Sequence, residues 1–165
     1  MRLISRVFMF LLLVLSSVCV AETYNMETQF ITPIKLPSKL VSLVNEHLDS
    51  PFERSGCAAS LRQSLEASFV RLSPTDKLSI LVKPAESCLC GAHTCSFWII
   101  RQCGSSYCFA GHLHAHSIEI NKATLLNDYY GLTGLPGGAA SSEATHFLFD
   151  GTSYIEKKIG LKKIK

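Results

Sequence analysis

The residues with the clearest chemical potential are three histidines at alternate positions, His112, His114 and His116. On an extended strand, residues two apart share one face, so three imidazoles there could surround one metal ion. Imidazole nitrogen is a good ligand for Zn²⁺, Cu²⁺ and Ni²⁺. His93 or His146 could add a fourth ligand. One interpretation of the run is therefore a metal site, with Zn or Cu as the candidate ion.

The interpretation that we favour is that Gly111 to His116 forms an exposed hairpin turn. If the strand continued, its alternation would place Ile118 and Ile120 on the histidine face, against the core rather than at an open site. Such a turn would leave the histidine side chains exposed and would not direct them toward one point. On this interpretation we expect no cofactor. A pH sensor made of clustered imidazoles, with a pKa near 6.5, is a third interpretation.

Six cysteines follow the first 21 residues, and five of them lie within a short segment. The pairs Cys90–Cys95 and Cys103–Cys108 both have the pattern C-G-x-x-x-C, which suits a bridge across a short turn between strands. Cys57 and Cys88 then remain for each other. We therefore favour the pairing 57–88, 90–95 and 103–108 among the 15 that six cysteines allow. A zinc cluster of Cys88, Cys90, Cys95 and His93 is the alternative, although the spacing is not the paired C-x2-C of common zinc modules.

The first 21 residues are predicted to be a cleaved signal peptide. Arg2 and Arg6 precede the apolar run 7–15, and small residues lead up to Ala21. An uncleaved anchor and a lipid-modified Cys19 are the alternatives. Cleavage removes Cys19 and leaves an even number of cysteines, which in an exported chain predicts disulfides. We expect a periplasmic or secreted protein.

The charge distribution excludes some classes of partner. Removing two arginines from 16 basic residues leaves 14, against 13 acidic ones, so the mature chain has no basic character that would favour nucleic acid. No later stretch has the 18 or more apolar residues of a membrane span. A lysine-rich tail at 157–165 could touch an anionic surface, although a solvated terminus is the simpler interpretation. Its lysines are Lys157, Lys158, Lys162, Lys163 and Lys165.

Residues 22–165 are expected to form a single α+β domain. A helix with Ser38 as its cap is predicted to run to about Leu48, and a second helix is predicted over about 56–71 with Cys57 on its buried stripe. Later segments show strand character, and Asp150-Gly151 predicts a hairpin. We expect one or two N-terminal helices and then an antiparallel sheet of about five to seven strands. The predicted strands are 78–83, 96–101, 107–110, 117–121, 145–149 and 152–156.

Two of these patterns together resemble a known group of proteins. The segment CGAHTCSFWIIR joins C-G-x-x-x-C to an aromatic strand, and residues 149–154 have the pattern F-D-G-x-x-Y. Over about 78–157 the chain resembles small uncharacterised exported bacterial proteins. The resemblance implies a periplasmic or secreted β-rich domain and transfers no catalytic residue. Cys103, Cys108 and the histidine run lie outside the shared pattern.

The sequence favours a binding protein over an enzyme. No nucleophile–base spacing, phosphate loop or zinc-protease motif is present. We expect an exported domain that binds another protein, of inhibitor, immunity or accessory type. Its expected contact surface is the loop 135–142, which begins Leu135, Pro136, Gly137 and Gly138, with the Gly111–His116 turn. The alternatives are a metal-binding protein that uses His112, His114 and His116, and a small hydrolase without a recognised motif.

Overall fold

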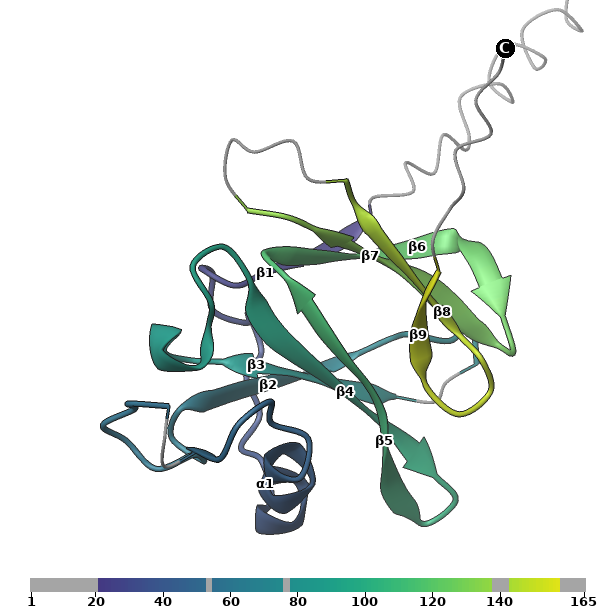
Figure 1. The fold of residues 1–165 in the computed structure, drawn as a ribbon. Coiled ribbons are helices and arrows are strands. Elements are labelled where there is room, and N and C mark those ends of the chain that lie inside the picture. Colours follow the sequence, from purple (N-terminus) through teal and green to yellow (C-terminus); the bar gives the residue numbers. More distant parts are fainter. Residues whose placement is uncertain (1–20, 53–54, 76–77, 138–142, 158–165) are drawn as a thin grey trace, which may run out of the picture.

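The computed structural model describes residues 21–52, 55–75, 78–137 and 143–157, and Figure 1 shows their arrangement. Within these ranges the chain forms nine strands in two antiparallel sheets, with one α-helix and a short 3₁₀ helix at Ser87–Leu89. The elements are β1 (Glu22–Asn25), α1 (Ser38–Asn45), β2 (Leu65–Val70), β3 (Ser79–Pro84), η2 (Ser87–Leu89), β4 (Cys95–Cys103), β5 (Ser106–Ala115), β6 (Ser117–Leu126), β7 (Tyr129–Leu135), β8 (Thr145–Phe149) and β9 (Tyr154–Lys157).

The two sheets divide the chain between them. One sheet has the strand order β2-β3-β4-β5, and the other has the order β1-β6-β7-β8-β9. β5 ends at Ala115 and β6 begins at Ser117, so the chain passes from one sheet to the other at His116. β1 joins the second sheet by pairing with β6.

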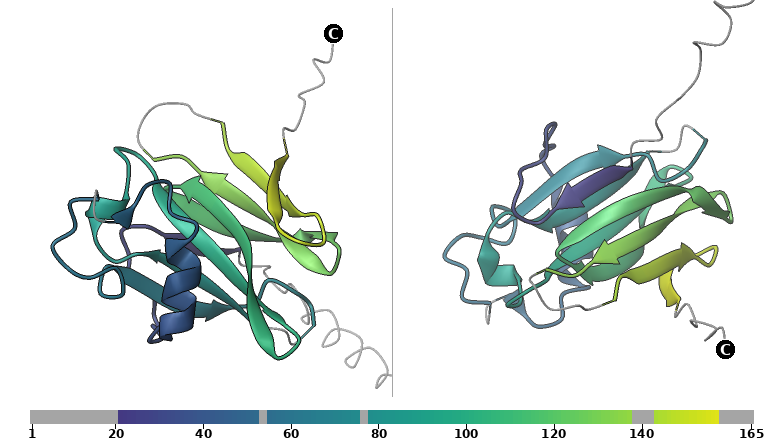
Figure 2. Two further views of the ribbon diagram at one scale, coloured as in Figure 1. Left: turned by 60° about the horizontal axis from the view of Figure 1, so that its bottom comes forward. Right: turned by 90° about the horizontal axis from the view of Figure 1, so that it is seen from above.

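The molecule has three layers, with the four-stranded sheet in the middle (Figures 1 and 2). The core between the two sheets includes Phe97 and Ile99 of β4 and Ile120 of β6. A second core lies between the four-stranded sheet and α1, where Val44 packs near Trp98. The two central strands of the middle sheet, β3 and β4, are therefore covered on both faces.

Burial on both faces explains the apolar sequences of β3 and β4. Every residue of Ser79–Pro84 is buried, and Phe97 to Ile100 are all at most 1% exposed. Along β4, Phe97 and Ile99 face the other sheet, while Trp98 and Ile100 face α1. A strand that is covered on both sides has no solvent face, so apolar and polar residues do not alternate.

One charged side chain, that of Lys83, lies inside this middle sheet and is 2% exposed. Its Nζ is 3.4 Å from Oε2 of Glu66 and donates to the carbonyl oxygens of Asn25, Met26 and Thr28. Glu66 in turn accepts a hydrogen bond from the Phe30 amide. The buried ion pair thus attaches the segment after β1 to the middle sheet.

The second predicted helix is wrong. Residues 65–70 form β2, which pairs with β3 in the register Leu65↔Pro84 to Val70↔Ser79. Ala67 and Val70 are buried while Phe69 is 46% exposed, so burial along this segment follows the pairing of β2 in the sheet and not a helix. Cys57 accordingly lies before β2, outside any helix or strand.

The first predicted helix is present but shorter than expected. It ends at Asn45 instead of about Leu48, and Pro37 occupies the N-cap position in place of Ser38. The expectation of a single sheet of five to seven strands is also wrong, because nine strands of the described chain form two sheets. Short β1, β2 and β7 were not predicted.

The Asp150-Gly151 hairpin is confirmed. β8 and β9 pair through Phe149↔Tyr154, and Asp150 accepts hydrogen bonds from the amides of Thr152 and Ser153. Gly151 has a φ of 111°, a backbone conformation that glycine adopts readily.

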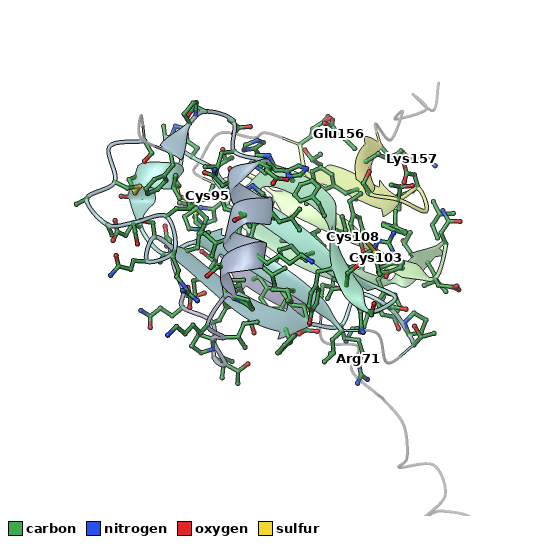
Figure 3. The ribbon with its side chains drawn as sticks, turned by 90° about the horizontal axis from the view of Figure 1, so that it is seen from below. Arg71, Cys95, Cys103, Cys108, Glu156 and Lys157 are labelled. Atoms are coloured by element: carbon green, nitrogen blue, oxygen red, sulfur yellow. A yellow bond between two sulfur atoms is a disulfide. The ribbon has the colours of Figure 1, made fainter. Side chains whose placement is uncertain are left out.

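Three disulfides are present, in the pairs that the spacing favoured. They join Cys57 to Cys88, Cys90 to Cys95, and Cys103 to Cys108. Figure 3 labels Cys95, the first residue of β4, and the Cys103–Cys108 pair where β4 turns into β5. Because these sulfurs are bonded to each other, the predicted zinc cluster of Cys88, Cys90, Cys95 and His93 is not formed.

Two predictions concern residues that the structure does not describe. The signal peptide lies in 1–21, of which only Ala21 is described, and the basic tail lies in 157–165, of which only Lys157 is described. Among the described helices, none has the length and apolar character needed to cross a membrane.

Candidate metal centre

The histidine run lies mostly within a strand, so the predicted hairpin turn at Gly111–His116 is wrong. Gly111 to Ala115 belong to β5 and pair with β4, with Trp98 opposite His112 and Ser96 opposite His114. The expected conflict with Ile118 and Ile120 does not arise. Those two side chains belong to the core between the sheets, because the chain changes sheets at His116.

His112 and His114 lie on the α1 side of the four-stranded sheet. The imidazole of His112 stacks on the indole of Trp98, with ring centroids 5.3 Å apart, and the two imidazole centroids are 4.5 Å apart. The side chain of His112 is 17% exposed and that of His114 is 51% exposed. The strand alternation therefore brings these two imidazoles together, as the first interpretation of the run expected.

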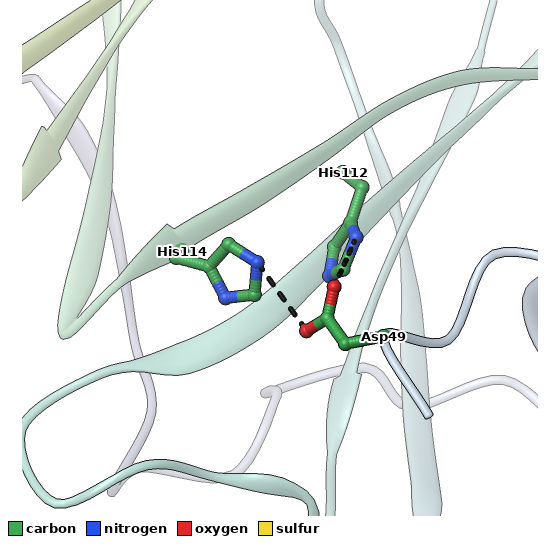
Figure 4. Close-up of side chains that lie close together, drawn as sticks. All are labelled: Asp49, His112 and His114. Carbon is green, nitrogen blue, oxygen red and sulfur yellow. Dashed lines mark ion pairs between the residues drawn. The ribbon is translucent and has the colours of Figure 1, made fainter. Parts of the chain in front are cut away.

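Asp49 completes the group from a distant part of the sequence, in the segment that follows α1. Figure 4 shows its carboxylate facing both rings. Oδ1 of Asp49 lies 3.7 Å from Nδ1 of His112, and Oδ2 lies 3.4 Å from Nε2 of His114. One ligand atom from each of the three side chains falls within 4.8 Å of the other two.

These separations are too long for good hydrogen bonds, which span about 2.7–3.2 Å between nitrogen and oxygen. They are close to the spacing of ligands around a shared ion. Two ligand atoms each about 2.1 Å from a tetrahedral ion lie roughly 3.4 Å apart. The other ring nitrogen of His112, Nε2, is buried without a hydrogen-bond partner. The three side chains are thus near one another without satisfying one another.

The environment keeps His112 neutral. Burial, which is the largest cause, acts together with the neighbouring His114 and His47 to lower the pKa of its imidazole from 6.5 to about 4, against the opposing effect of Asp49. A neutral imidazole has a free nitrogen lone pair, which is the form that binds a metal ion.

The other predicted histidines lie elsewhere. His116 follows β5, and its amide donates to the Leu135 carbonyl. Nδ1 of His146 on β8 lies 3.3 Å from Oγ1 of Thr133. His93 lies in the loop that the Cys90–Cys95 disulfide closes. None of these three belongs to the group of ligand atoms formed with Asp49, so the structure brings together His112 and His114 of the predicted run but not His116.

A second group of possible ligands, Cys57, Glu86 and Cys88, is of a different kind. Its two sulfurs form a disulfide, and Sγ of Cys88 lies 3.7 Å from Oε2 of Glu86. Disulfide sulfur lacks the thiolate charge on which metal binding by cysteine depends. The Asp49–His112–His114 group is therefore the stronger candidate in the described part of the chain.

A pocket of about 310 Å³ opens beside this group. Asp49, His114 and the Trp98 indole line one part of it, and the disulfide cysteines Cys88 and Cys90 line another. A larger pocket of about 420 Å³ lies beside β1 and β2, away from the histidines. Two of the three candidate metal ligands therefore line the smaller pocket, whereas none lines the larger one.

The loop that was expected to contact a partner is only partly described. Leu135 ends β7, Pro136 and Gly137 follow it, and Gly138 lies outside the described residues. A Cβ on Gly137 would lie 2.7 Å from the His93 carbonyl oxygen and 2.8 Å from Nδ1 of His116. The start of this loop is thus packed against its neighbours.

Sequence reasoning missed Asp49. No motif connects it with the histidines, and only the packing of the segment after α1 over β5 brings it there. The chain matches no protein-family model, no curated protein and no solved structure. The candidate function therefore depends on the geometry of the site.

Proposed function

We propose that this chain is an exported, disulfide-stabilised domain that binds a divalent transition-metal ion through Asp49, His112 and His114. The observation that carries the proposal is the spacing of the three side chains, at 3.4 and 3.7 Å between carboxylate and imidazole atoms. Two imidazoles and one carboxylate suit Zn²⁺ or Cu²⁺ better than Mg²⁺ or Ca²⁺.

Export is supported by the cysteines. Three disulfides fit a protein that works outside the reducing cytosol. The predicted signal peptide agrees with this location. In such an environment thiolates are scarce, so imidazole and carboxylate are the ligands that remain for a metal ion.

The two other predicted functions remain predictions. For binding of a protein at the loop that begins at Leu135, the described residues 135–137 supply no contact that favours it. For a hydrolase, Ser96 lies opposite His114 in the strand register, and Asp49 lies 3.4 Å from Nε2 of that imidazole. No hydrogen bond joins Ser96 to His114 in the described chain, so metal binding is the better supported function.

Calorimetric titration of the disulfide-bonded protein with Zn²⁺ and with Cu²⁺ tests the proposal. We expect one ion per chain for the wild type. Mutating a residue that only hydrogen-bonds to a metal ligand typically lowers metal affinity roughly 10- to 100-fold. His114→Ala removes a ligand itself, so we expect it to lower the affinity by at least that factor. Asp49→Asn should also weaken binding.

His116→Ala is the matched control, because it removes an imidazole of the same run that lies outside the group. It should bind like the wild type. Equal affinity in His114→Ala and His116→Ala would instead indicate adventitious binding by surface histidines and would overturn the proposal.

A further inference from the structure

We propose that the metal site takes a small carboxylate as an additional ligand, held in the 310 Å³ pocket beside Asp49 and His114. This inference rests on the proposed function. It adds a ligand class to the metal site, and the site then recognises a molecule as well as an ion.

The first argument is the number of ligands. Asp49, His112 and His114 supply three ligand atoms. Zn²⁺ with three protein ligands keeps a fourth position for water or another molecule, whereas a structural site is closed by four. No further histidine, cysteine thiolate or carboxylate of the described chain joins the three.

The second argument is where that position faces. Asp49 and His114 both line the pocket, whereas His112, which stacks on Trp98, does not line it. A molecule bound to the ion from the open side would therefore occupy the pocket. Its volume is at the lower end of the range of about 300–1,000 Å³ for small-molecule sites.

The third argument is the chemistry of the pocket wall. Four hydroxyl-bearing residues line it, namely Ser50, Ser55, Thr94 and Ser96. Hydroxyl groups both donate and accept hydrogen bonds, so they suit a ligand with polar substituents. Among the described residues of the wall there is no lysine or arginine, and the metal ion would supply the positive charge.

The charge balance selects a monoanion. A divalent ion with one carboxylate and two neutral imidazoles carries a net charge of +1. A single carboxylate on the ligand neutralises that charge, whereas a dianion would leave a negative excess in a partly enclosed site. A small hydroxycarboxylate such as glycolate has both the anionic oxygen and a hydroxyl for the pocket wall.

Spectroscopic competition on the Cu²⁺-loaded protein tests the inference. Azide bound to Cu²⁺ gives a charge-transfer absorption band, which reports an open position on the ion. We expect azide to produce the band in the wild type and glycolate to abolish it in a saturable way. The fluorescence of Trp98 is followed in the same samples, because quenching by Cu²⁺ shows that the ion stays bound.

Ser50→Phe fills the pocket without removing a metal ligand. Ser50 is exposed and lines the pocket. This variant should keep the Cu²⁺ quenching and lose at least tenfold in apparent glycolate affinity. Ser105→Phe, an exposed serine in the turn between β4 and β5, is the control and should behave like the wild type.

Each other outcome overturns the inference. Absence of the azide band with Cu²⁺ bound would show a closed site. Equal glycolate affinity in Ser50→Phe would place the carboxylate outside the pocket, and recovery of Trp98 fluorescence would show that glycolate only removes the ion. Failure of Cu²⁺ to bind at all would instead overturn the proposed function.

Discussion

The imidazole of His112 lies almost parallel to the indole of Trp98, with an angle of 14° between the planes. Trp98 is the only tryptophan of the chain and is 1% exposed. Its Nε1 donates a hydrogen bond to the His47 carbonyl, so the indole is fixed both by this bond and by its stacking on His112. The single strong fluorophore of the protein thus contacts one of the three proposed metal ligands.

Cu²⁺ bound at the proposed site should therefore quench most of the Trp98 fluorescence, because a paramagnetic ion beside His112 is close to the indole. His114→Ala should lower the sensitivity of the quenching to Cu²⁺ by at least about tenfold. His146→Ala, on the other sheet, should leave the titration unchanged. Quenching that persists unaltered in His114→Ala would contradict the assignment of the site.

The metal-free protein should lose stability as the pH falls from about 6.5 to about 4. Burial lowers the pKa of His112 to about 4, whereas the unfolded chain titrates near 6.5. Between these values the unfolded state binds a proton that the folded state does not, so acid favours unfolding. Below about pH 4 His112 is protonated in both the folded and the unfolded state. The stability that neutral His112 contributes above about pH 6.5 is then fully lost.

Thermal unfolding in the presence of a chelator measures this effect. His112→Phe keeps an aromatic ring against Trp98 and removes the titrating group, so its Tm should fall less over the same pH range than that of the wild type. An identical pH dependence in the two proteins would show that His112 does not titrate as described.

The features that could be predicted from the sequence are local. The Asp150-Gly151 hairpin depends on a turn whose hydrogen bonds come from the next three residues. The 90–95 and 103–108 disulfides each close a short segment, and the pair left over followed from them. The alternation of His112 and His114 on one face likewise follows from strand geometry alone.

The features that sequence reasoning missed depend on contacts between distant segments. The residues from Leu65 to Leu72 fit a helical spacing, but pairing with β3 makes 65–70 a strand. Asp49 meets the histidines only because α1 packs on the four-stranded sheet. Tertiary context overrides local propensity in the first case and creates the site in the second.

Lys83→Met should destabilise the protein by about 3–5 kcal/mol. The side chain of Glu66, which is only 13% exposed, would lose its cation, and three carbonyl oxygens would lose their hydrogen-bond donor. Lys39→Met, at an exposed position of α1, should change stability by less than about 0.5 kcal/mol. Adding Glu66→Leu to Lys83→Met should recover part of the loss. Denaturant unfolding with the disulfides intact checks all three, and equal stability of the two lysine variants would contradict the role given to the buried pair.

The three disulfides should contribute unequally to stability. Cys57–Cys88 spans 31 positions of the sequence, and Cys103–Cys108 spans 5. Loop-closure entropy then gives about 3.7 kcal/mol for the longer loop and about 2.1 kcal/mol for the shorter one. Replacing Cys57 and Cys88 together with serine should therefore lower the free energy of unfolding by about 1.6 kcal/mol more than the same change at Cys103 and Cys108.

Chemical denaturation of the two double-serine variants measures this difference directly. Mass spectrometry before and after reduction first verifies that each variant keeps its two other bridges. Cys88 lines the pocket, and the loss of its bridge should loosen the segment around it. The Cys57–Cys88 variant should therefore bind Zn²⁺ more weakly than the Cys103–Cys108 variant, whose missing bridge lies at the far end of β4. If the shorter bridge proved the more stabilising, native-state contacts rather than the entropy of the unfolded chain would control the contribution of these crosslinks.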